Sequence, residues 1–179
     1  MTNEPILYRR IEQGLDLVRT LCMAVASVAL VVLIATFGWL VFGRYVLNVT
    51  PTWVEQLALL LICYIAFLGA AVGVREDTHI GVTLFRDLLP ITLQKLVLIG
   101  IDFMLAGFGV LILLSGLELM AFGMDTVLPM LGLPEAVRTG AITSLGALMV
   151  LFSGLRGVLR ILRFGAWSPL DHPLDQEVM

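Results

Sequence analysis

The two cysteines are the first candidates for chemistry, because a thiolate can exchange disulfides or bind a metal. A four-helix thiol oxidoreductase of similar size needs cysteine pairs in loops, where a thiolate can form and react. Cys22 and Cys63 are single, and each lies inside a long apolar stretch. We predict that both are small buried hydrophobic side chains.

The two histidines exclude haem chemistry. A membrane cytochrome b needs histidines inside its helices to ligate iron, but His79 and His172 both lie outside the apolar stretches. Paired carboxylates, an HExxH motif, a Ser-His-Asp grouping and a phosphate-binding glycine loop are also missing from the sequence. We therefore expect no enzyme activity, no cofactor and no metal site.

Asp102 is the one ionisable residue well inside an apolar stretch, where a charge is costly enough to need a reason. It could be a proton or cation site. It could also be held structurally, by an ion pair or a hydrogen bond to a neighbouring helix. Lys95 precedes it by seven residues, about two turns on the same helix face. We favour the structural interpretation.

Membrane-spanning helices must position these residues. The chain has 179 residues, of which 59% are hydrophobic and 14% charged, against about 25% charged in soluble domains. A span needs roughly 20 apolar residues, and four stretches qualify: about 20–43, 56–74, 95–118 and 138–156. The first is too long for a secretory signal. We predict an all-α integral membrane protein with one domain over 1–167 and a disordered tail over 168–179.

Basic residues predict the orientation, because Lys and Arg flanking the spans stay in the cytoplasm. Nine of them lie in the two tails and the second loop, and two, Arg44 and Arg138, lie on the other side. We therefore expect both termini in the cytoplasm. The net charge of -3 gives no reason to expect nucleic acid binding.

The segments between the spans have patterns of their own. Residues 4–19 alternate apolar and charged residues at helical spacing, which is typical of a short amphipathic helix on the inner leaflet. The loop over 76–94 is apolar enough to lie along the membrane surface. The external loop over 119–138 is also apolar, and Pro134 is expected near the first turn of the fourth helix.

Two pairs of residues could fix how the helices meet. Arg44 and Glu55 carry opposite charges at the end of the first span and the start of the second, so we favour an ion pair across this hairpin over separate snorkelling to the head groups. Gly69 and Gly73 form a GxxxG pair, which lets another helix approach closely in lipid. Chance occurrence of the glycine pair stays open.

Four segments, taken in order, resemble the small DctQ-type subunit of tripartite ATP-independent periplasmic (TRAP) transporters. Their sequences are GRYVLN at 43–48, WVEQL at 53–57, FLGAA at 67–71 and REDTHI at 75–80. The resemblance extends over nearly the whole chain. Together with the charges above, it suggests these structural or subunit-interface residues: Arg44, Asn48, Trp53, Glu55, Gly69, Gly73, Arg75, His79 and Asp102.

The resemblance implies a multi-pass protein of the bacterial inner membrane in a secondary transporter. Such a transporter is usually sodium-coupled and imports organic acids, such as dicarboxylates, delivered by a periplasmic binding protein. The family's large DctM-type subunit carries the substrate and sodium sites, and the small subunit braces it. Membrane lipids are the remaining expected partner.

A stand-alone small carrier or channel is the alternative. It predicts polar residues converging along a pore, whereas these spans offer Asp102 and scattered Ser and Thr. Neighbouring genes for a large membrane protein and a secreted binding protein would favour the transporter subunit.

Overall fold

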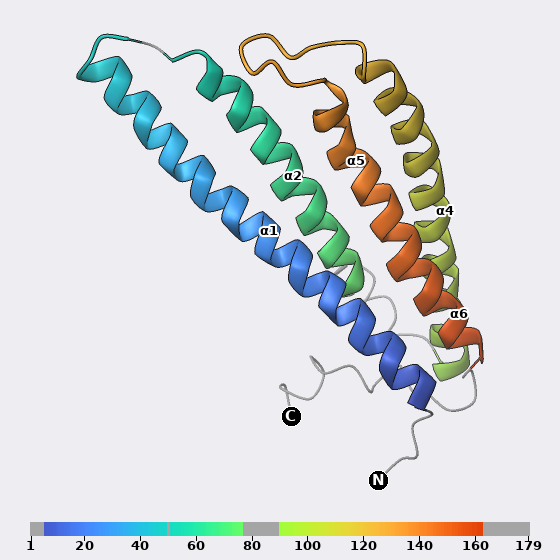
Figure 1. The fold of residues 1–179 in the computed structure, drawn as a ribbon. Coiled ribbons are helices and arrows are strands. Elements are labelled where there is room, and N and C mark those ends of the chain that lie inside the picture. Colours follow the sequence, from blue (N-terminus) through green and yellow to red (C-terminus); the bar gives the residue numbers. More distant parts are fainter. Residues whose placement is uncertain (1–5, 50, 77–89, 163–179) are drawn as a thin grey trace, which may run out of the picture.

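The computed structural model describes residues 6–49, 51–76 and 90–162. Four long apolar helices in this part of the chain could each cross a membrane by length and composition, which confirms the prediction of four spans (Figure 1). The helices are α1 (Ile6–Tyr45), α2 (Trp53–Arg75), α4 (Ile91–Gly123) and a fourth made of α5 (Ala136–Met149), η1 (Val150–Gly154) and α6 (Leu155–Leu162).

The N-terminal segment is helical from Ile6, as expected, but it is not a separate short helix, because it is continuous with the first span. No proline interrupts residues 6–45, so the intrahelical hydrogen bonds run through. At 1.5 Å per residue the 40 residues of α1 extend for about 60 Å, twice the roughly 30 Å hydrocarbon core of a bilayer. The start of α1 therefore reaches well beyond the membrane-spanning part.

The four helices form one layer in the order α1, α2, α5, α4 (Figure 1). Helix α1 packs along α2, α2 packs against α5, and α4 packs against α5, η1 and α6. We call the end where α1 begins and α6 ends the terminal end. The opposite end, which carries the connections from α1 to α2 and from α4 to α5, is the hairpin end (Figure 1). Both faces of such a layer are left open to lipid or to another protein.

Glycines let α4 and α5 approach closely. A Cβ built on Gly116 would lie 2.7 Å from Thr143 Oγ1, and one built on Gly123 would lie 2.7 Å from the Ala136 nitrogen. Larger side chains would force the helices apart. The close contacts repeat every seven residues on both antiparallel helices. The contacting pairs are Gly123 with Ala136, Gly116 with Thr143, Gly109 with Val150 and Asp102 with Gly157.

The two connections at the hairpin end turn tightly. After α1, Asn48 adopts a left-handed conformation with φ 54°, which asparagine tolerates better than most residues. Between α4 and α5, Val127 and Pro134 form an isolated antiparallel bridge, and Gly132 takes φ 66°. Helix α5 begins at Ala136, two residues after Pro134. These turns fix the two antiparallel pairs of helices.

Candidate functional site

Asp102 of α4 is buried at the terminal end of the layer, with 1% of its side chain exposed. Two arginines from the fourth helix hold it. Arg156 Nε donates to Asp102 Oδ1 over 2.9 Å, and Arg160 Nη1 donates to Oδ2 over 2.7 Å. Each carboxylate oxygen therefore has its own guanidinium, which stabilises the ionised form in surroundings that are otherwise costly for a charge.

Arg156 also contacts the end of α2. Its Nη1 donates to the carbonyl oxygens of Val74 over 3.0 Å and Arg75 over 3.3 Å. These carbonyls belong to the last turn of α2, where no intrahelical donor remains for them. A cation at this position is also favoured by the helix dipole. A single side chain thus connects α6 to both α4 and α2.

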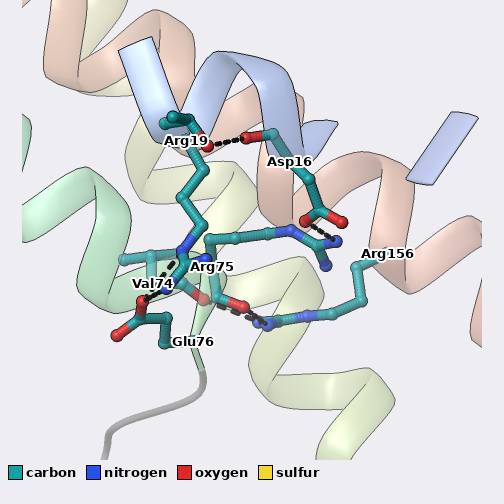
Figure 2. Close-up of polar contacts among 7 residues, drawn as sticks. Asp16, Arg19, Val74, Arg75, Glu76 and Arg156 are labelled. Carbon is teal, nitrogen blue, oxygen red and sulfur yellow. Dashed lines mark hydrogen bonds and ion pairs between the residues drawn. The ribbon is translucent and has the colours of Figure 1, made fainter. Parts of the chain in front are cut away.

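Helix α1 reaches the same end of α2 from the other side (Figure 2). Arg75 Nη2 lies 3.0 Å from Asp16 Oδ1, and Arg19 Nε donates to Glu76 Oε1 over 2.9 Å. Asp16 and Arg19 lie three residues apart on one face of α1. Asp16 of α1 therefore pairs with Arg75 of α2, and Arg19 of α1 pairs with Glu76, which follows α2.

Together these residues form what we call the charge cluster: Asp16, Arg19, Arg75, Glu76, Asp102, Arg156 and Arg160. It joins all four membrane-spanning helices at one end of the layer. Asp102, Arg156 and Arg160 form its buried part, and the two contacts of α1 are more exposed. Carboxylates held by guanidiniums suit mechanical connection and do not resemble a nucleophile with its base. Within the described residues no three His, Cys, Asp or Glu side chains gather as metal ligands would.

Sequence reasoning anticipated the pairing of Asp102 but not its partners. It considered Lys95 on the same helix and left Arg156 and Arg160 among the residues that mark the cytoplasmic side. A signal for them was present. The two arginines are four residues apart and so share a helix face. They lie at the end of the fourth span, and Asp102 lies near the start of the third. In antiparallel helices these two ends meet at the same depth.

The expected ion pair across the first hairpin is absent. Arg44 and Glu55 are both described, both exposed, and form no ion pair with each other. At the start of α2, Trp53 is 41% exposed. Opposite charges at the ends of one hairpin do not suffice for a contact when both side chains can extend into the head-group region. A role for these three residues in contacts with another subunit stays a prediction.

The glycine pair of α2 makes no close helix contact through Gly69, which is exposed and has open space where a Cβ would stand. Glycines of α4 and α5, such as Gly116 and Gly146, do make close approaches. Cys22 is buried, as predicted, against Leu68 and Val72, whereas Cys63 is partly exposed. His79 and most of the 76–94 loop lie outside the described residues, as does the 168–179 tail.

The chain is similar to a known protein family and to a curated protein. The family model described as "Tripartite ATP-independent periplasmic transporters, DctQ component" matches residues 33–163. The sialic acid TRAP transporter small permease protein SiaQ of Vibrio cholerae serotype O1 is 36% identical over 58 residues. That alignment covers 32% of this chain and 34% of the Vibrio protein, so the chain matches about a third of its relative's length.

Proposed function

Because the chain belongs to the DctQ component family of tripartite ATP-independent periplasmic transporters, we propose that it braces a large DctM-type subunit during ion-coupled import of an organic acid. It is a multi-pass protein of the bacterial inner membrane. In this proposal it is a transport subunit and not an enzyme, and residues 1–167 form one membrane domain. A periplasmic binding protein delivers the solute.

The charge cluster is the observation that carries the bracing role. Its most deeply buried charge, Asp102, is 1% exposed and held by two guanidiniums from a neighbouring helix. A cation site needs carboxylate oxygens that a passing ion can reach, and ions leave such a site only if the binding is weak enough. A carboxylate whose two oxygens each accept a hydrogen bond from an arginine suits a structural role better.

The open faces of the layer support a protein partner. Between 17% and 33% of the most apolar part of each span is buried within the chain, so most of each span must face lipid or another protein. Exposed glycines such as Gly69 and Gly107, with open space around them, would let a helix of the large subunit approach closely. Lipid alone would not need small residues there.

The solute is proposed as a carboxylate-bearing organic acid. The name of the Vibrio relative gives sialic acid, a sugar acid, as the solute of its own transporter, and dicarboxylates belong to the same chemical class. We propose sodium as the coupling ion, by the resemblance described above. The hairpin end faces the periplasm in this proposal, because nine of the eleven Lys and Arg residues lie in the two tails and the second loop.

The test is uptake by proteoliposomes that contain the small subunit, the large subunit, or both, with the binding protein and a sodium gradient. We expect uptake from the pair and none from the small subunit alone. Uptake by the small subunit alone would instead support a stand-alone carrier. Equal uptake by the large subunit with and without its partner would remove the bracing role.

A further inference from the structure

A groove runs along one side of the α4–α5 pair, starting at the hairpin end. The part at the hairpin end has a volume of about 420 Å³ and is lined by residues that include Cys63 of α2, Phe122 of α4 and Thr139 of α5. A second hollow of about 240 Å³ continues toward the middle of the layer and is lined by apolar side chains with Ser115 and Gly116. Leu119 and Ile142 line both hollows, so the two adjoin along the same side of the α4–α5 pair.

The groove has the length of one leaflet. Its lining extends along α4 from Gly123 to Leu111, which is about 18 Å at 1.5 Å per residue, and Thr126 extends it beyond the end of the helix. Half of a hydrocarbon core is about 15 Å, and the head-group region adds about 5–7 Å on each side. A groove that starts at the hairpin end therefore reaches from head-group depth to about the bilayer midplane.

The two ends of the groove differ in polarity. At the mouth, Arg138 and Glu135 form an ion pair through Arg138 Nη2 and Glu135 Oε1, and Thr126 lies beside them. Both charged side chains are partly exposed, at 43% and 31%. A guanidinium has five N–H donors and a carboxylate has two acceptor oxygens, so each partner keeps capacity for a further contact. Deeper in the groove the walls are apolar.

We propose that this groove binds one phospholipid whose head group carries both a phosphate and a primary ammonium. The phosphate accepts hydrogen bonds from Arg138, the ammonium donates to Glu135, and one acyl chain lies along Leu119 and Ile142 toward Ser115. A pair of opposite charges at the mouth matches a zwitterion with its own opposite charges. A purely anionic head group would meet the Glu135 carboxylate as well as the guanidinium.

The test uses the full chain, purified in detergent and stripped of lipid. Native mass spectrometry measures its binding of phosphatidylethanolamine, phosphatidylcholine and phosphatidylglycerol with identical acyl chains. We expect one phosphatidylethanolamine to bind most tightly. The trimethylated head group of phosphatidylcholine cannot donate hydrogen bonds, so its affinity should be about tenfold lower, the usual effect of a lost hydrogen bond to a charged group. Bound phosphatidylethanolamine should also slow methanethiosulfonate modification of Cys63.

Matched variants separate the two parts of the groove. Ser115→Trp fills the apolar part and should weaken all three lipids, whereas Ser27→Trp, on an exposed position of α1, should not. The double variant Glu135→Gln, Arg138→Gln should remove the preference for phosphatidylethanolamine over phosphatidylcholine. Arg44→Gln, a charge change at the same end outside the groove, should keep it. Circular dichroism and thermal melting confirm that each variant is folded.

Four results would overturn the proposal. Equal affinity for the three lipids would mean unspecific contact, and tightest binding of phosphatidylglycerol would mean a simple cationic surface. If co-assembly with a large membrane subunit displaced the lipid and protected Cys63 in its place, the groove would be a protein contact. Equal effects of Ser115→Trp and Ser27→Trp would place the lipid elsewhere.

Discussion

Asp102 of α4 and Arg156 of α6 are joined by a hydrogen bond of 2.9 Å between Asp102 Oδ1 and Arg156 Nε, although 54 residues separate them in the sequence. The same arginine holds two carbonyls at the end of α2. Arg156 therefore fixes the relative position of three helices, and the consequences of breaking this contact can be measured.

Replacing Asp102 by Asn should destabilise the chain. The change leaves two largely buried guanidiniums without their counter-charge, and breaking a buried pair in this way costs about 3 kcal/mol. Thermal and chemical unfolding in detergent would measure it. The partner variants Arg156→Gln and Asp102→Asn together should cost less than the sum of the single changes, because each alone leaves a charge uncompensated. Strictly additive costs would mean that the pair is not coupled.

Sodium coupling should survive the same substitution. If Asp102 is structural, Asp102→Asn lowers the amount of assembled transporter but leaves the shape of the sodium dependence of uptake unchanged. Uptake by proteoliposomes with the large subunit and the binding protein, normalised to assembled complex, would show this. A changed ion stoichiometry would instead assign Asp102 a direct role in transport.

Gly116 and Gly69 should respond differently to alanine. A Cβ on Gly116 would lie 2.7 Å from Thr143 Oγ1, so Gly116→Ala must shift α4 against α5 and should cost about 1–3 kcal/mol in unfolding experiments. A Cβ on Gly69 meets nothing within 4 Å, so Gly69→Ala should leave the isolated chain as stable or slightly more stable.

The Gly69 variant also tests subunit contact. If Gly69 lies against the large subunit, Gly69→Ala should reduce co-purification of the pair while the isolated chain melts as before. Unchanged co-purification would restrict the role of Gly69 to lipid contact.

The orientation can be tested by labelling. In a background without Cys22 and Cys63, cysteines at positions 48 and 125 should react with an impermeant thiol reagent added outside spheroplasts, because both lie at the hairpin end. A cysteine at position 171 should react only after the membrane is opened. Labelling of position 171 alone from outside would reverse the proposed topology.

The sequence by itself determined the class of fold and the number of spans. A backbone in lipid must satisfy its hydrogen bonds locally, so any apolar stretch of about 20 residues that crosses the membrane is a helix, and the charges that bound each stretch can be read directly. Asp102 could likewise be identified from sequence as a residue that needs a partner, since a charge at that depth is costly.

The tertiary structure decided which faces meet. In a membrane the helix face that contacts lipid is as apolar as the face that contacts another helix. Hydropathy therefore does not show which face is buried. Sequence reasoning therefore left open whether Gly69 marks a helix contact, whereas Gly116 and Gly123 do make close approaches. It also paired Arg44 with Glu55 by position along the chain. The α4–α5 register brings Arg156 to Asp102, because close packing of glycines fixes that register across residues far apart in sequence.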